Sequence, residues 1–251
     1  MVAFLFKAFP IALVVLVTLS PFAAGSVGME LQARIVHDLS AGRPVVVHVV
    51  VALCDNANQG IVPVPQELGN GQDPGSNLYW GALFGVKTHF SKQGWKSIAV
   101  TKPEDRRILE RVVYFRALPR DGSEVPVYAV ADAWDGAEIR GALQSFLAMA
   151  SGDGVQRLKL PDESGTKEIG AGGEAHLVAY VGHNGLMEFE LPRPGPRSDL
   201  RPANASIVLA CASKPYFLGH LGAAGSHPLL LTTGLMAPEA YTLEAVLLTP
   251  A

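Results

Sequence analysis

An almost uninterrupted apolar run at residues 44–53, PVVVHVVVAL, constrains the fold of this 251-residue chain more than any other feature. A strand with apolar side chains on both faces has to be covered on both sides, which is typical of the central strands of a parallel sheet. The run therefore predicts a three-layer α/β/α sandwich with a mostly parallel sheet. Since 49% of the residues are hydrophobic, one domain of this length can bury a substantial core.

Further elements follow from apolar periodicity and from the positions of Gly and Pro. Apolar runs of strand length lie at residues 175–182 and 206–210. Apolar residues repeat at helical spacing in three segments, which we expect to be helices: 30–39, 77–92 and 138–149. The turn at 119–122 predicts a hairpin. We expect the polar, Gly-rich stretch at 151–173 to leave the core as a flexible connection.

The first 25 residues have the pattern of a secretory signal peptide. Lys7 precedes an apolar run at residues 11–19, and the small residues 23–25 precede Ser26. This run is shorter than the roughly 20 residues that a membrane-spanning helix needs. We therefore expect cleavage before Ser26, no stable membrane anchor, and an exported domain over residues 26–251, periplasmic or secreted. The alternative is a cytoplasmic protein whose translation starts at Met29.

Charge and cysteine content narrow the classes of function. A formal net charge of -3 and a pI of about 6.2 provide no general basic field, so we expect no nucleic-acid partner. Cys54 and Cys211 are too few for a disulfide framework. Neither belongs to a C-x-x-C pair, and His220 and His227 lack the i,i+4 spacing of a helical zinc site. The sequence therefore implies no metal site and no cofactor.

Two of the expected strands each end in a reactive side chain. The run at 175–182 leads into His183, and the run at 206–210 leads into Cys211. The carboxyl ends of parallel strands meet at one edge of a sheet, so the two side chains can face the same crevice. An imidazole near a thiol can hold it as the nucleophilic thiolate. The bland alternatives are an inert core cysteine and a hydrogen-bonded histidine at a strand end.

This arrangement resembles the clan CD cysteine peptidases, which include caspases, legumains and gingipains. Their signature is an apolar block ending in His-Gly, followed by a second block ending in Ala-Cys. Residues 209–213, LACAS, are similar to the legumain form of the second block. The first block departs from it, because Asn184 stands between His183 and Gly185. The resemblance covers residues 44 to about 236 and implies a caspase-like sheet.

The resemblance also implies roles for individual residues. Cys211 would be the nucleophile and His183 its partner, with the backbone N–H groups of Gly185 and Cys211 as oxyanion donors. Asp55 and Asn56 follow the first strand, where the family forms its substrate pocket, and Ser213, which completes the motif, would be a further substrate-binding residue. The alternative for Asp55 or Asn56 is that each only caps a turn.

We therefore expect a cysteine-type endopeptidase or related thiol hydrolase acting on a peptide or protein substrate. The alternative is a catalytically silent member of the same fold that serves as a binding module in the cell envelope. The resembled sheet places the strand ending at His183 between those ending at Cys54 and Cys211. Two strand spacings are about 9 to 10 Å, too far for a disulfide, so we expect two free thiols.

Overall fold

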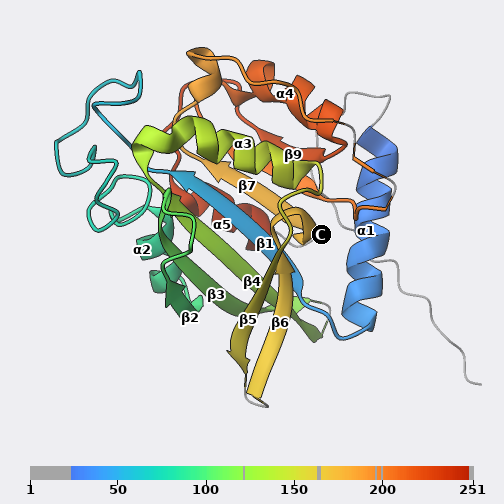
Figure 1. Cartoon of the computed structure of the whole chain (residues 1–251). Coiled ribbons are helices and arrows are strands. Elements are labelled where there is room, and N and C mark those ends of the chain that lie inside the picture. Colours follow the sequence, from blue (N-terminus) through green and yellow to red (C-terminus); the bar gives the residue numbers. More distant parts are fainter. Residues whose placement is uncertain (1–23, 121, 163–164, 196, 199, 249–251) are drawn as a thin grey trace, which may run out of the picture.

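The structure of the chain, a computed structural model, describes residues 24–248 except 121, 163–164, 196 and 199 (Figure 1). A seven-stranded sheet in the order β2-β3-β4-β1-β7-β8-β9 forms its centre. Its strands are β1 (Val45–Ala52), β2 (Lys96–Thr101), β3 (Ile108–Arg120), β4 (Ser123–Trp134), β7 (Leu177–Val181), β8 (Ala205–Leu209) and β9 (His227–Leu231). The helices are α1 (Ala24–Ser40), α2 (Val86–Lys92), α3 (Ile139–Ala150), α4 (Ser213–Ala224) and α5 (Ala240–Leu248).

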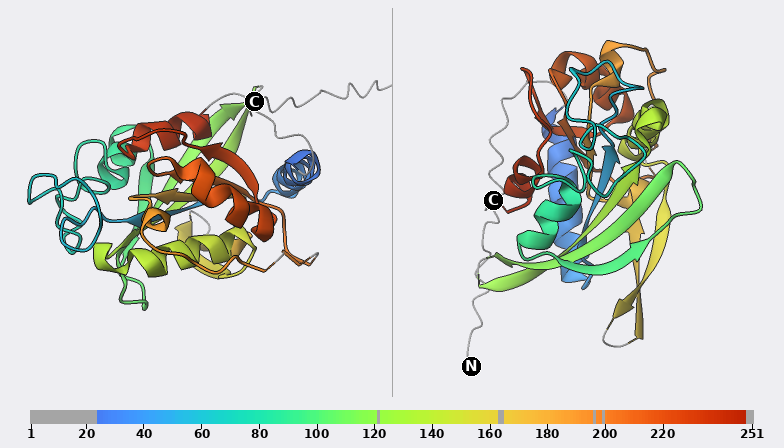
Figure 2. Two further views of the ribbon diagram at one scale, coloured as in Figure 1. Left: turned by 90° about the horizontal axis from the view of Figure 1, so that it is seen from above. Right: turned by 90° about the vertical axis from the view of Figure 1, so that its left-hand side faces the viewer.

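The sheet is mostly parallel and is covered on both faces. Strand β1 pairs in parallel with β4 and β7, β8 pairs in parallel with β7 and β9, and β3 alone runs opposite to the other six strands, antiparallel to β2 and β4. Viewed from above, α5 and α3 lie on opposite sides of the sheet (Figure 2). The three-layer α/β/α sandwich predicted from the valine-rich run is thus confirmed.

The alternation of side chains along β1 divides the core into two clusters. Val47, Val49 and Val51 pack with residues of α1, α2 and α5, whereas Val46 and Val50 pack with residues of α3 and α4 on the other face. Every one of these valines is at most 3% exposed. An apolar strand sandwiched between two helical layers needs no polar face, which is why β1 carries almost none.

The structure differs from the sequence-based expectation in two segments. Of the helix expected at 77–92, only α2 forms, and the residues before it form turns that fold closely on one another. A Cβ on Gly85 would lie 2.5 Å from the Trp80 carbonyl carbon. The stretch at 151–173 is not a loose connection. It forms an antiparallel hairpin of β5 (Gln156–Asp162) and β6 (Gly165–Ala171), which places Leu160 and Ile169 against the α3 side of the core.

A buried charged network ties the middle of the sheet together. Arg111 of β3 donates to both carboxylate oxygens of Asp132 on β4, over 2.5 and 2.6 Å. His48 Nε2 lies 3.0 Å from the same carboxylate, and His48 Nδ1 accepts from the Gly172 N–H. Burial alone would raise the pKa of Asp132, but the bonds from Arg111 and His48 hold it below its usual value. The carboxylate therefore stays ionised.

Helix α1 is fixed to the amino-terminal edge of the sheet by polar contacts. Arg34 donates to the carbonyl oxygens of Ala203 and Glu174, over 2.7 and 2.5 Å. Asp38 lies 3.0 Å from Nε2 of His176, whose Nδ1 accepts from the Val46 N–H. The expected signal segment lies almost wholly outside the described residues, which begin within it at Ala24. No helix in the described part of the chain is long and apolar enough to cross a membrane.

Candidate functional site

The strand order brings His183 and Cys211 to the same edge of the sheet. Strands β7 and β8 are adjacent and parallel, with Val181 opposite Leu209, and the Gly182 N–H donates to the Leu209 carbonyl. His183 follows β7 by two residues, and Cys211 follows β8 by two residues. Strand β7 also lies between β1 and β8, the order that the resemblance to clan CD peptidases implies. Both cysteines are free thiols.

His183 is oriented by a carboxylate that the sequence analysis did not identify. Its Nε2 lies 2.5 Å from Oε1 of Glu188, and its side chain is only 10% exposed. The same Glu188 oxygen accepts from the Gly60 N–H over 2.8 Å, and a side chain on Gly60 would collide with the carboxylate. Since a carboxylate accepts from Nε2–H, the lone pair of the imidazole is left on Nδ1.

The Cys211 thiol contacts the chain that follows β9. It donates to the Met236 carbonyl over 3.3 Å, and the Met236 N–H lies 3.4 Å from the sulfur. Among the described residues, no hydrogen bond joins the thiol to His183. The two residues are therefore at one sheet edge, but in this conformation the sulfur is engaged by Met236.

Asn184, the residue that interrupts the family pattern, lies between the two strand ends. Its Nδ2 donates to the Cys211 carbonyl over 2.8 Å, and its side chain is fully buried. Its Oδ1 is buried and has no hydrogen-bond partner among the described residues. Asn184 thus fixes the backbone of Cys211 relative to that of His183. The extra residue acts as a connection between the two motifs.

The turn after Cys211 has an unusual backbone conformation. Ala212 has φ 42° and ψ 44°, and it is the one described non-glycine residue with a positive φ. A left-handed conformation costs an alanine about 1 to 2 kcal/mol, so surrounding contacts must hold it. The Ala212 N–H donates to the Gly234 carbonyl over 2.8 Å. In the described part of the chain, the Cys211 N–H has no hydrogen-bond partner, so it is free to donate.

Two buried tyrosines link the strand ends. The Tyr79 hydroxyl lies near the Cys54 thiol and within electrostatic range of Cys211. Tyr180 donates to the His183 carbonyl over 2.7 Å. Burial raises the pKa of both phenols, and the neighbouring thiols add to this for Tyr79, so both stay protonated. Burial also raises the pKa of the Cys54 thiol, which makes it a poor nucleophile.

The proposed substrate-binding residues Asp55 and Asn56 hold a long loop in place. Asp55 is 1% exposed and accepts from the Ala57 and Asn58 N–H groups and from Gln72. Burial alone would raise the pKa of Asp55, but these bonds hold it below its usual range. The Asn56 amide donates to and accepts from the Val64 backbone. These contacts agree with the turn-capping alternative for both residues.

Two further residues of the motif are also engaged within the protein. Ser213 is fully buried, and its hydroxyl bonds to the Val208 carbonyl and to Thr232. The Gly185 N–H donates to the His183 carbonyl over 3.0 Å and so has no free hydrogen for an oxyanion. A Cβ on Gly185 would lie 2.7 Å from Phe189. Contact of Ser213 with a substrate stays a prediction, and its side chain is not exposed to solvent in this structure.

Asn77 is a second residue that the sequence analysis missed. Its amide accepts from the Cys54 N–H and donates to the Cys54 carbonyl, so it continues the sheet ladder with a side chain. It is fully buried. Its only sequence signal is a polar residue beside the Gly-rich loop. The signal for Glu188 is as weak, because it is only a carboxylate five residues after the motif histidine. The short 3-10 turn Gly185–Met187 brings Glu188 to His183.

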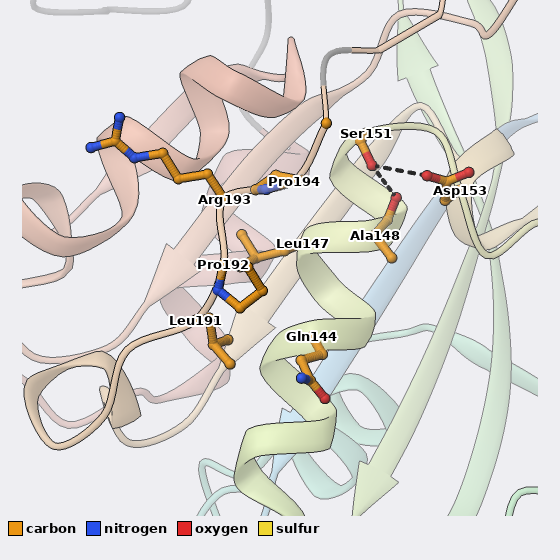
Figure 3. A pocket seen from close by; sticks show the side chains of 10 residues that line it. Gln144, Leu147, Ala148, Ser151, Asp153, Leu191, Pro192, Arg193 and Pro194 are labelled. Atoms are coloured by element: carbon orange, nitrogen blue, oxygen red, sulfur yellow. Dashed lines mark hydrogen bonds between the residues drawn. The ribbon is translucent and has the colours of Figure 1, made fainter.

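A shallow pocket of about 230 Å³ lies elsewhere, between α3 and the Pro-rich segment after β7 (Figure 3). Ser151 donates to the Ala148 carbonyl and lies 3.4 Å from Asp153, while Arg193 points away toward α4 (Figure 3). Asp153 is paired with Arg201. Among the described residues, no histidine or other free base lies beside the Ser151 hydroxyl, and the nearby Asp153 carboxylate is already paired with Arg201. This pocket therefore does not support nucleophilic chemistry.

Comparison with known proteins adds no relative. No protein-family model, curated protein or solved structure matches this chain. Within the described ranges, no group of three or more His, Cys, Asp or Glu side chains could hold a metal ion. The geometry of the strand ends is therefore the basis for assigning a function.

Proposed function

We propose that the protein is an exported thiol hydrolase that acts on peptide or protein substrates, as the clan CD resemblance implies. The observation that carries this proposal is the strand order β1-β7-β8, which sets His183 and Cys211 at the carboxyl ends of adjacent parallel strands. Ligands of open α/β sheets bind at this edge. The bond from Asn184 to the Cys211 carbonyl supports the pairing further, since it joins the two strand ends directly.

In the proposed reaction, His183 takes the thiol proton on Nδ1, and the Cys211 sulfur attacks the substrate carbonyl carbon. The tetrahedral oxyanion accepts a hydrogen bond from the Cys211 N–H, which has no other partner among the described residues. The carbon–nitrogen bond then breaks, His183 returns its proton to the leaving amine, and a thioester remains on Cys211. Water hydrolyses the thioester to a free acid. Glu188 acts through His183 as a positioning residue, because it holds the ring and its tautomer.

The family's second oxyanion donor has no counterpart in this conformation, because the Gly185 N–H is bonded to His183. Removing one oxyanion donor from such a site costs about 10²- to 10³-fold in rate. We therefore expect slow turnover. A slow enzyme is best detected by covalent labelling, which needs the nucleophile and its base but not a complete catalytic cycle.

The decisive experiment treats the protein with a peptidyl acyloxymethyl ketone and locates the adduct by peptide mass spectrometry. We expect modification at Cys211, loss of labelling in Cys211→Ala, and a labelling rate at least about tenfold lower in His183→Ala. His37→Ala is the matched control, since His37 is an exposed histidine on α1 outside the site. Equal rates for His183→Ala and His37→Ala would contradict the proposed dyad.

Glu188→Gln tests the positioning role separately. Glutamine keeps the size of the side chain but can present its N–H to the ring and favour the other tautomer. We expect slower labelling and a changed pH dependence of the labelling rate, while the unfolding midpoint stays within about 2 °C of the wild type. A purely structural role would lower the unfolding midpoint and leave the pH profile unchanged.

The second candidate function is a catalytically silent binding module. The contact of the thiol with Met236, rather than with His183, favours it. A binding module should retain affinity for its partner in Cys211→Ala and show no labelling preference for Cys211 over other accessible nucleophiles. The labelling experiment above separates the two functions.

A further inference from the structure

The segment at residues 232–239, called the strap below, joins β9 to α5 and runs over the end of β8. Three backbone contacts hold it to the turn after β8. The Ala212 N–H donates to the Gly234 carbonyl over 2.8 Å, the Met236 N–H reaches the Cys211 sulfur over 3.4 Å, and the thiol donates to the Met236 carbonyl over 3.3 Å. The strap thus engages both hydrogen-bonding functions of the sulfur.

The strap meets the turn after β8 through its backbone. It contains no helix or strand of its own, and Gly234 and Met236 contact the turn through backbone groups only, as an added peptide does in backbone recognition. The residue between them, Leu235, turns its side chain to solvent and is 85% exposed. Hydrogen bonds made by backbone groups can be made equally by another polypeptide segment in the same place.

Both ends of the strap are anchored independently of Cys211. At its start, the Thr232 N–H donates to the Ser213 hydroxyl, and the hydroxyl groups of the two residues lie 2.9 Å apart. Toward its end, Pro238 is buried, and just beyond it the Ala240 N–H donates to the Phe84 carbonyl. The middle of the strap can therefore move while its ends remain attached.

We infer that residues 234–236 occupy the position of a peptide substrate and hold Cys211 in a resting state, an inference that rests on the proposed function. An incoming peptide replaces the strap, its carbonyl accepts from the Ala212 N–H, and its displacement of Met236 releases the sulfur. The substrate class is accordingly a polypeptide segment recognised through its backbone. No residue is proposed to be cleaved in the strap itself.

The test compares two alanine variants of neighbouring strap residues. Met236→Ala removes a side chain that packs on the core, whereas Leu235→Ala, the matched control, removes one that is exposed to solvent. The readout is the iodoacetamide labelling rate of Cys211, with buried Cys54 in the same molecule reporting any general unfolding. We expect Met236→Ala to raise the Cys211 rate about tenfold. Leu235→Ala should stay within about twofold of the wild type, and Cys54 should be unchanged in both.

A synthetic peptide of residues 232–238 supplies the second measurement. Added to Met236→Ala, it should slow labelling of Cys211, whereas a peptide of the same composition in scrambled order should not. An unchanged Cys211 rate in Met236→Ala, or a rise matched by Leu235→Ala, would overturn the resting-state inference. Absence of protection by the peptide would overturn the assignment of a peptide-binding position.

These outcomes are distinct from those that test the hydrolase. Faster labelling in Met236→Ala together with no dependence on His183 would retain the strap and remove the proposed dyad. Labelling that depends on His183 but not on Met236 would retain the hydrolase and remove the strap. The two proposals can therefore fail separately.

Discussion

Acid sensitivity of the contact between α1 and the sheet is the prediction that the structure specifies most fully. The His176 side chain is 5% exposed, its Nδ1 accepts from the Val46 N–H, and its Nε2 donates to Asp38. Adding a proton to Nδ1 would remove the acceptor and set two N–H groups against each other. Burial, and next the charge of Arg34, lower the pKa of His176 from 6.5 to about 4.

The direction in which pH changes the free energy of unfolding follows from proton binding. Between pH 6.5 and about 4 the unfolded chain binds a proton at His176 that the folded protein does not, so acid favours unfolding. The stability is fully present above pH 6.5 and is lost as the pH falls toward 4. The linkage relation gives a loss of about 1.4 kcal/mol at pH 5.5 and about 2.5 kcal/mol at pH 4.5.

Urea denaturation of the wild type and of His176→Asn at several pH values measures this loss. Asparagine retains an oxygen that can accept from the Val46 N–H but does not titrate. The difference between the two free energies of unfolding should therefore change by about 2.5 kcal/mol between pH 7.5 and pH 4.5. A difference that is constant with pH would refute the reasoning, because it would mean that the folded protein protonates His176 as readily as the unfolded chain does.

Three further predictions concern stability and reactivity. Asp132→Ala should lower the free energy of unfolding by about 3 to 5 kcal/mol in urea denaturation, since it leaves Arg111 buried without its partner, and the added change Arg111→Met should recover part of that loss. Ala212→Gly should not destabilise the protein, while Ala212→Val should cost about 1 to 2 kcal/mol, because a β-branched side chain fits the left-handed conformation poorly. Brief alkylation of the unreduced protein followed by mass spectrometry should show Cys211 modified faster than Cys54, and a native disulfide between them would contradict the strand order.

Several features of the fold were determined by sequence pattern alone. The valines of β1 predict burial on both faces, and the apolar runs ending at Gly182 and Ala210 predict neighbouring parallel strands. These predictions succeed because strand character depends on local side-chain sequence and the sheet edge at which parallel strands end is common to all of them. The hairpin at the turn 119–122 was predicted for the same reason.

Local pattern failed where long-range packing overrode it. Residues 77–85 have apolar spacing suited to a helix, yet they form turns in which Asn77 completes the Cys54 backbone pairing and the Gly85 backbone lies close to that of Trp80. The polar stretch at 151–173 forms a hairpin because Leu160 and Ile169 pack against the core. The residues next to them in the sequence do not indicate this contact.

The candidate site shows the same division. Sequence alone determined that His183 and Cys211 each follow an apolar run of strand length, whereas the clan CD resemblance implied that the two strands are neighbours, and the sheet order gives that arrangement. Only the tertiary structure decided which group each one meets: Glu188 for the imidazole and Met236 for the thiol. Hydrogen-bond partners depend on the positions of chain segments that are distant in sequence or follow an irregular turn, and no periodicity of the residues encodes those positions.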